Sequence, residues 1–254
     1  MLQLYHWEPN GACARVMIAL KEKGLEFESR YVDLLAFEQH SPDFLALSGT
    51  GETPVLVRDG EAFTESSYVC EHLDEAFPDP PLMPSDPYGR WRARGWQKYV
   101  DDYLAAAVAD LAWAAFGAGA LQGRDIDPGR ILARVPTHER RAVWAEALAG
   151  HDEARLDRAR GRVRLAVEKI EAELEGGDWL AGAAFSLADI AVFAYLNYLS
   201  RLNPRLLDPG AAPRTAAWLE RVSGRPGVKA ALAMARTPDP YAAAAPGPEH
   251  VRWG

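Results

Sequence analysis

The first 80 residues alternate between short apolar runs and turn signals, as in a mixed α/β domain. Leu2–Trp7 alternates weakly between polar and apolar residues and predicts a strand, which Asn10-Gly11 ends. Ala14–Lys23 has the spacing of a helix that Gly24 stops, and Phe27–Val32 predicts a second strand. The chain is therefore expected to begin with a β-α-β unit.

The same region continues with a helix, a hairpin and a last helix. Ser41–Leu47 predicts a short helix. Pro54–Arg58 and Glu61–Phe63 flank Asp59-Gly60, which is a strong signal for a two-residue hairpin. Ser66–Ala76 then predicts the last helix. The order β-α-β-α-β-β-α is that of a thioredoxin-like fold.

A run of prolines separates this region from one with helical spacing. Prolines neither continue a helix nor pair within a sheet, so the stretch around Pro81 and Pro84 reads as a linker. Apolar residues beyond it recur at helical spacing, as in Trp96–Leu111 and Leu156–Leu174. We predict an α+β domain at 1–80, a linker at 81–88, an all-α domain at 89–237 and a tail at 238–254.

The helical region contains one long stretch without clear periodicity. Gly117–Gly150 is rich in Gly, Arg and Trp, and we interpret it as a loop with a short helix over the cleft. Leu187–Leu199 and Arg214–Val222 predict two further helices. Ser186-Leu187-Ala188-Asp189 has the spacing of a capping box, whose role is structural.

Composition and charge narrow the class of function. With 48% hydrophobic and 25% charged residues the chain is expected to fold, and its net charge of -8 argues against a nucleic-acid partner. No apolar run approaches the roughly 18 residues that span a bilayer. The start lacks the pattern of a signal peptide, and two cysteines suit a reducing cytoplasm. The six histidines lack metal-ligand spacing, so we expect no metal site.

Cys13 is the candidate catalytic residue. It lies where the first helix begins, a position that lowers a thiol's pKa, and Arg15 adds to this effect if its side chain turns back. The alternative is a buried structural cysteine, since free cysteine is among the most buried residue types. These residues alone leave both open. Cys70, on an apolar helix face, is interpreted as core.

Two further sites suggest binding of a peptide-like ligand. Pro54 begins a strand, which suits an edge position, or else a cis proline that exposes the backbone of Thr53 to an extended peptide. Glu65 and Ser66 stand at a helix start, where free N–H groups bind carboxylates. Ser66 either caps its own helix or receives a ligand carboxylate, while Glu65 takes the adjacent amino group.

Four motifs in this order resemble the cytosolic glutathione transferase superfamily over nearly the whole chain. They are Leu4-Tyr5 opening a strand, the Gly-x-x-Pro-x-Leu of Gly51–Leu56, Glu65-Ser66, and Ser186-x-x-Asp189. Each is weak alone, and the order and distances make them specific together. The resemblance implies a thioredoxin-like domain that binds glutathione, followed by an all-helical domain that holds the electrophile.

Within the family, the likeness is greatest to bacterial lignin β-etherase-like members. Its markers are Phe37-Glu38-Gln39-His40-Ser41 and the insert from Arg134-Val135-Pro136 through Glu139 to Trp144. Those enzymes tend to have serine where this chain has Cys13. Cysteine occurs there in beta- and omega-like transferases and in reductive dehalogenases of the same fold.

The resemblance implies roles for the residues of the glutathione site. Thr53 and Val55 flank a cis Pro54, and Thr53 pairs with the cysteinyl backbone of glutathione. Glu65 and Ser66 hold the γ-glutamyl end. These roles agree with the carboxylate site inferred from the helix start.

The glycyl end of glutathione is less well matched by this sequence. His40 falls where theta- and phi-like members have a histidine or lysine for the glycyl carboxylate. The family often has Lys or Gln where this chain has Glu52, and an acid does not suit a carboxylate. By analogy a homodimer is expected, with the segment around Tyr99–Tyr103 near its axis and Asp101 or Asp102 near the partner's glutathione.

The expected reaction is attack of glutathione thiolate, as co-substrate, on a small hydrophobic and aromatic electrophile. Ether cleavage and conjugation are both compatible with it. Trp7, Trp113, Phe116 and Trp144 are candidate pocket residues, with core packing as their alternative. The alternatives for the protein are Cys13-dependent thiol transfer or reductive dehalogenation, and a non-catalytic glutathione-binding module.

Overall fold

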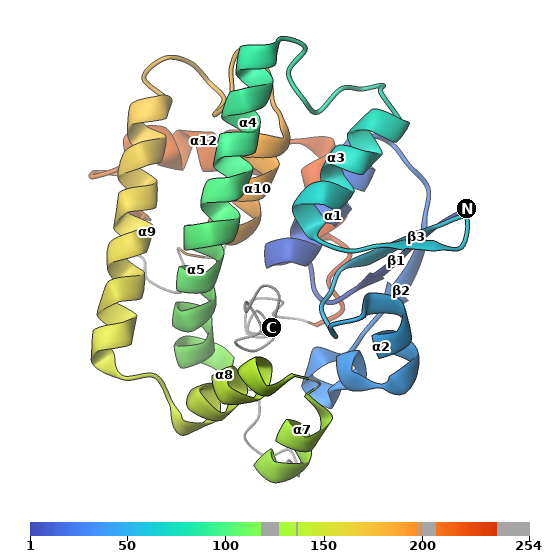
Figure 1. The fold of residues 1–254 in the computed structure, drawn as a ribbon. Helices are drawn as coiled ribbons and strands as arrows, with labels where there is room; N and C mark the ends of the chain where they lie inside the picture. The colour runs from blue at the N-terminus through green and yellow to red at the C-terminus, as the bar shows by residue number, and fades with distance from the viewer. Residues whose placement is uncertain (118–126, 136, 198, 200–206, 238–254) are drawn as a thin grey trace.

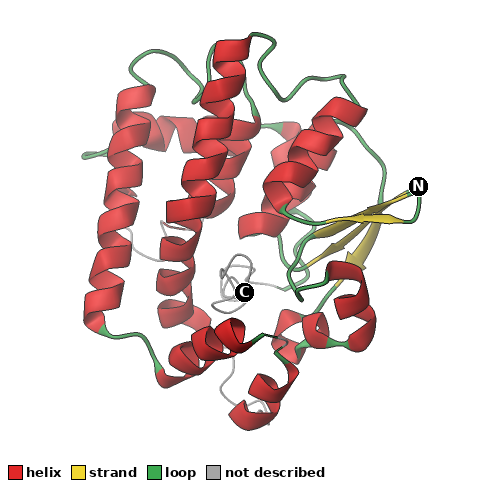
Figure 2. Ribbon diagram, in the orientation of Figure 1, coloured by secondary structure: helices red, strands yellow, loops and turns green. Residues whose placement is uncertain are grey.

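The computed structural model describes residues 1–117, 127–135, 137–197, 199 and 207–237. Figure 1 shows two parts side by side: a small sheet with the helices next to it, and a larger part made of helices. Figure 2 shows that the strands lie together in the first of these parts. The predicted fold class, an α+β thioredoxin-like domain followed by an all-α domain, is confirmed. Within the described ranges, no helix combines the length and apolar character needed to cross a membrane.

The N-terminal part has the predicted order β-α-β-α-β-β-α. Its elements are β1 (Leu2–His6), α1 (Gly11–Glu22), β2 (Glu28–Tyr31), η1 (Leu34–Ala36), η2 (Glu38–His40), α2 (Pro42–Ser48), β3 (Val55–Arg58), β4 (Glu61–Phe63) and α3 (Ser66–Ala76). The short 3-10 turns η1 and η2 were not predicted, because apolar periodicity is not visible in segments of three residues. The predicted hairpin turn at Asp59-Gly60 joins β3 to β4.

The sheet has the strand order β2-β1-β3-β4. β1 runs parallel to β2 and antiparallel to β3, with Tyr5 opposite both Arg30 and Val55. Alternation along β1 buries Leu4 on one face and leaves Tyr5 on the other, where its ring lies 6.3 Å from that of Phe44 in α2. α1 and α3 pack together and against α10, between the sheet and the helical part (Figure 1).

The elements that the structure describes in the C-terminal part are helices joined by loops. Its elements are α4 (Pro87–Tyr99), the π-helical segment η3 (Val100–Leu104), α5 (Ala105–Ala112), the π-helical segment η4 (Trp113–Gly117), α7 (Pro128–Arg134), α8 (His138–Ala149), α9 (Glu153–Glu173), α10 (Leu187–Leu196), α12 (Pro213–Ser223) and α13 (Pro226–Leu232). The predicted tail at 238–254 and the end of the predicted helix Leu187–Leu199 lie largely outside the described residues.

The described residues of the stretch Gly117–Gly150 contain more helix than the sequence predicted. The interpretation was one short helix, whereas the described residues form both α7 and α8. Each helix begins with its own cap, because Asp127 accepts from the N–H of Gly129 and Thr137 accepts from that of Arg140. Local capping therefore forms helices where apolar periodicity is weak.

The proline-rich connection between α3 and α4 is fixed to the N-terminal part. Asp74 accepts hydrogen bonds from the N–H groups of Leu82 (2.7 Å) and Met83 (3.1 Å). Lys23 at the end of α1 pairs with Asp74 at 2.7 Å and donates to the carbonyl of Phe77. These buried polar contacts hold the chain where it passes from one part to the other.

The predicted capping box at the start of α10 is confirmed. Ser186 caps the helix, and the Asp189 carboxylate accepts from the N–H groups of Ser186 (2.9 Å) and Leu180 (3.0 Å) and from Trp218 Nε1 (2.9 Å). Burial raises the pKa of Asp189 to about 6, while these hydrogen bonds act to lower it. Asp189 thus joins three segments of the helical part through one buried side chain.

We predict that Asp189→Ala destabilises the protein by about 3 kcal/mol, because buried donors from three segments lose their acceptor. The measurement is the urea midpoint followed by far-UV circular dichroism. Asp157→Ala is the matched control, since Asp157 lies on α9 in an exposed pair with Arg160. Equal midpoints for the two variants would contradict the role given to Asp189.

Candidate glutathione site

The first turn of α1 brings Cys13 to the loop before β3. Gly11 has φ +50°, a left-handed conformation that favours glycine, and a Cβ there would be in van der Waals contact, at 3.4 Å, with the ring of Tyr195 in α10. Cys13 is only 4% exposed. Its Sγ donates to Thr53 Oγ1 and accepts from the N–H of Trp7, each at 3.4 Å. Cys13, Trp7 and Thr53 are therefore neighbours.

The predicted lowering of the Cys13 pKa is wrong for the protein without ligand. Burial raises the pKa of Cys13 to about 11, and the negative charge of Glu8 acts in the same direction. The hydrogen bonds of the Cys13 sulfur with Thr53 and Trp7 lower this pKa by less. Arg15 does not turn back to the thiol, because it binds Asp101 Oδ1 at 2.6 Å. Desolvation of the thiolate outweighs the helix terminus here.

The peptide bond between Thr53 and Pro54 is cis, as the family resemblance implies. β3 begins at Val55, which lies opposite Tyr5 of β1, so Thr53 precedes the paired part of the strand. The bond between the Cys13 thiol and the Thr53 hydroxyl joins α1 to this loop. The arrangement places the side chain of Thr53 directly beside the candidate catalytic residue.

The start of α3 differs from a helix capped by its own serine. Glu65 occupies the capping position with φ +64° and ψ 96°, a left-handed conformation that is uncommon outside glycine, and Ser66 is the first helical residue. Arg15 Nη1 donates to Ser66 Oγ at 3.4 Å, and Asp101 accepts from Ser67 Oγ at 2.8 Å. Because Arg15 is a donor only, the hydroxyl hydrogen of Ser66 is free to point to another acceptor.

His40 and Glu52 lie beside the same loop. His40 is buried, its ring stacks on Phe37, and its Cδ2 lies 3.0 Å from where a Cβ on Gly51 would be. Glu52 forms an ion pair with Arg140 of α8, with 2.7 Å between Oε1 and Nη2. Glu52, whose charge does not suit a carboxylate ligand, is therefore neutralised by Arg140 of the insert.

The four aromatic candidates have different surroundings. Trp7 is 2% exposed, and its ring lies 5.3 Å from that of Tyr31. Trp113 and Trp144 are buried edge to face against one another at 5.6 Å, which is the packing of core residues. Phe116, in η4, is half-buried.

Sequence reasoning missed two buried charges next to the site, Glu8 and Arg140. Glu8 is fully buried, and it accepts from the hydroxyl of Tyr31 at 2.6 Å and from the N–H of Arg236 at 3.0 Å. Its signal in the sequence was an acid in the loop between the first strand and Cys13. Arg140 carried no local signal, because its partners are remote in sequence.

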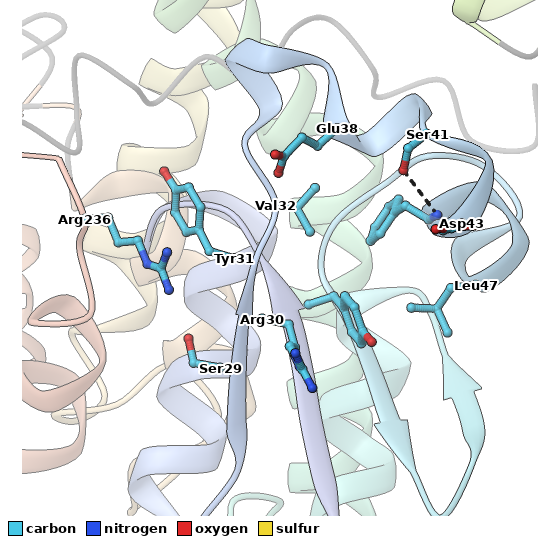
Figure 3. Close-up of a pocket in the computed structure, with 11 residues that line it drawn as sticks. Ser29, Arg30, Tyr31, Val32, Glu38, Ser41, Asp43, Leu47 and Arg236 are labelled. Atoms are coloured by element: carbon cyan, nitrogen blue, oxygen red, sulfur yellow. Dashed lines mark hydrogen bonds between the residues drawn. The ribbon is translucent and has the colours of Figure 1, made fainter.

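A cavity of about 690 Å³ lies elsewhere, at the edge of the sheet. Tyr31 and Arg236 lie on one side of β2, and Asp43 and Leu47 lie on the other (Figure 3). No predicted site residue lines it, so this cavity is separate from the candidate site. In the part of the chain that the structure describes, no three His, Cys, Asp or Glu side chains are grouped to hold a metal ion.

Comparison with known proteins identifies the class. Residues 4–81 match the family described as Glutathione S-transferase, N-terminal domain, and residues 131–226 match Glutathione S-transferase, C-terminal domain. The chain belongs to the glutathione S-transferase family, as its sequence motifs predicted.

Two proteins illustrate where the chain falls within this family. Protein LigF of Sphingobium sp. (strain NBRC 103272 / SYK-6) is 36% identical over 236 residues, which are 90% of this chain and 91% of LigF. The crystal structure of Beta-etherase LigF from Sphingobium sp. strain SYK-6 has a TM-score of 0.87 and 33% identity, covering 92% of this chain and 99% of that one. Glutathione transferase F7 from Populus trichocarpa has a TM-score of 0.71 and 25% identity, covering 91% and 97%.

The raised pKa of Cys13 predicts slow alkylation of the folded, glutathione-free protein. Because only the thiolate reacts, the rate with iodoacetamide should rise with pH until about 11. In urea the thiol should titrate near its ordinary pKa of about 8.5. A Cys70→Ser background isolates the signal of Cys13. A rate that already levels off below pH 8 in the folded protein would mean an activated thiolate instead.

Proposed function

We propose that this protein uses glutathione to cleave a β-aryl ether. The same attack by glutathione thiolate would also displace other leaving groups from small aromatic electrophiles. The observation that carries the proposal is the likeness to Beta-etherase LigF over 92% of this chain and 99% of that one. Membership of the glutathione S-transferase family supports glutathione as the co-substrate. The proposal includes the cytoplasm as the setting, because glutathione is kept reduced there.

Glutathione would bind along the N-terminal part. In this proposal the backbone of Thr53, beside the cis Pro54 and before Val55, pairs with the cysteinyl residue. Glu65 takes the amino group of the γ-glutamyl end, and the hydroxyl of Ser66 with the start of α3 takes its carboxylate. The left-handed backbone of Glu65 and the donor from Arg15 to Ser66 support these roles.

The glycyl carboxylate and the electrophile would contact different parts of the site. His40, packed beside Gly51, is the proposed partner of the glycyl carboxylate, and Arg140 balances the charge of Glu52 near it. Phe116 is the proposed contact for the electrophile, because it is half-buried at the end of the α5 segment. Trp113 supports it from the core.

Cys13 would act as a neutral hydrogen-bond donor. With a pKa of about 11 in the unliganded protein it holds its proton at neutral pH and can donate S–H to the glutathione sulfur. This donor and the N-terminus of α1 favour the glutathione thiolate. The neutral thiol supports this reading over the alternative in which Cys13 is itself the nucleophile.

The proposed reaction is a displacement at the ether carbon. Glutathione thiolate attacks this carbon, a C–S bond forms, and the C–O bond breaks. The aryloxide leaves with the electron pair and takes a proton from water. The proton lost by the glutathione thiol balances this one, so the products are a glutathione thioether and a phenol.

Substitution of Cys13 tests this mechanism. Cys13→Ser should retain glutathione-dependent release of phenol from a β-aryl ether, because a hydroxyl is also a donor, whereas Cys13→Ala should lose about 100-fold in kcat. A chlorinated aromatic, followed by release of chloride, measures the same chemistry with another leaving group. Cys70→Ala is the matched control, since Cys70 is equally buried but lies on α3.

The other outcomes separate the alternatives. Loss of turnover in both Cys13 variants, together with a mixed disulfide between Cys13 and glutathione in the wild type, would make Cys13 the nucleophile. Binding of glutathione without turnover of either substrate class would favour a non-catalytic module.

The proposal includes a homodimer formed through α3 and the first helix of the helical part. Large aromatic side chains are exposed there, with Tyr68 on α3 at 62%, Trp91 on α4 at 67% and Tyr103 on η3 at 53%. Within this chain Asp101 binds Arg15 and Asp102 binds Lys98, and contact of either residue with the partner's glutathione stays a prediction.

Charged substitutions in this surface should separate the protomers. Tyr68→Glu combined with Trp91→Glu is expected to reduce the mass from that of a dimer to that of a monomer, because two carboxylates cannot be buried in an apolar contact. The measurement is light scattering after size exclusion. Leu165→Glu is the control, because Leu165 is 60% exposed but lies on α9. A double variant that keeps the wild-type mass excludes this surface.

A further inference from the structure

Arg140 is a buried cation that connects the insert to the glutathione loop. It lies on α8 and is only 1% exposed. Its Nη2 binds Glu52 Oε1 at 2.7 Å, and its Nη1 donates to the carbonyl of Thr50 at 2.9 Å. A buried guanidinium is unfavourable unless charge and hydrogen bonds compensate it. Both of these partners belong to one loop of the N-terminal part, although Thr50 is 90 residues away in sequence.

The loop that Arg140 binds contains two glycines with positive φ. Gly49 and Gly51 adopt φ +73° and +81°, and glycine enters such conformations and leaves them at low cost. Ser48 Oγ fixes one turn by accepting from the N–H of Gly51 at 2.9 Å. Arg140 fixes the residue between the two glycines and the residue after them. Thr53, the proposed partner of the cysteinyl backbone, follows directly.

The helix that carries Arg140 is itself held firmly. The ring of Trp144, one turn further along α8, lies 5.4 Å from Phe37 of the N-terminal part and 5.6 Å from Trp113 at the end of the α5 segment. Trp113 Nε1 also donates to the carbonyl of Ala147 at 2.9 Å. Figure 1 shows α8 between the lower end of α5 and the segment before α2. Arg140 therefore projects from a helix that is itself held in place by packing.

We propose that Arg140 is a positioning residue for glutathione, which acts through Thr50 and Glu52 to hold Thr53 in the geometry that pairs with the ligand. Its planar fork spans the carbonyl and the carboxylate together, which a lysine does not do. In this arrangement the carboxylate of Glu52 attaches the loop to Arg140 through their ion pair. The inference rests on the proposed function, because it concerns the affinity for glutathione.

The test compares glutathione affinity with turnover. Dissociation constants from calorimetry, with kcat and KM for glutathione, are measured for wild type, Arg140→Met, Arg140→Lys and Glu52→Gln. Arg140→Met should raise Kd and KM for glutathione about tenfold or more, while kcat at saturating glutathione stays within about twofold. The Kd and KM of Arg140→Lys for glutathione should lie between those of the wild type and those of Arg140→Met.

Non-additivity provides a second readout. If Arg140 acts through Glu52, the double variant Arg140→Met/Glu52→Gln should bind glutathione no more weakly than Arg140→Met alone. Arg141→Met is the matched control and should keep the wild-type Kd. Arg141 is the next residue of α8, and it donates to the carbonyl of Val135 within the insert.

A purely structural role makes a different prediction. It would lower the melting temperature of the Arg140 variants and leave Kd at the wild-type value, which would overturn the inference. If Arg140→Met does not fold, Arg140→Lys and Glu52→Gln decide the question by the same comparison. If the wild-type protein binds glutathione but cleaves no ether, only the proposed reaction is refuted. The Kd values for glutathione then still test the role of Arg140. Wild-type protein that binds no glutathione refutes both.

Discussion

The burial of the first turns of α1 is the constraint on which the site depends. α1 packs between the sheet and α10, where a Cβ on Gly11 would be in van der Waals contact with the ring of Tyr195. Cys13 and Arg15 are carried out of water by the same packing. A buried arginine requires a counter-charge, which Asp101 supplies from the helical part, and a buried thiol retains its proton.

Both parts of the chain therefore hold the glutathione site in place, although the proposed contacts with glutathione itself come only from the N-terminal part. Asp101 in η3 binds Arg15 and Ser67 at the start of α3, and Arg140 in α8 binds the loop before β3. The two contacts hold opposite ends of the proposed glutathione site. Movement of the helical part would reach both ends through these ion pairs, so the relation between the two parts also sets the geometry of the site.

The sequence predicted those features whose signals are local. Asp59-Gly60 and the Ser186 capping box encode their structures within four residues, and both were located correctly. The pKa of Cys13 was predicted with the wrong sign, because the helix start is visible in sequence and the burial beneath α10 is not. The ion pair of Glu52 with Arg140 was missed for the same reason, since it joins segments that only the tertiary fold brings together.

The charge of Glu8 makes the choice between the two roles of Cys13 sharper. A cysteine that serves as nucleophile needs its thiolate, and a fully buried carboxylate nearby opposes that state. Tyr31 and the N–H of Arg236 bind Glu8 by hydrogen bonds, so it is held in place beside the loop. A neutral Cys13 thiol that only donates a hydrogen bond carries no charge for the Glu8 carboxylate to repel. The surroundings of Cys13 therefore favour its neutral thiol over its thiolate.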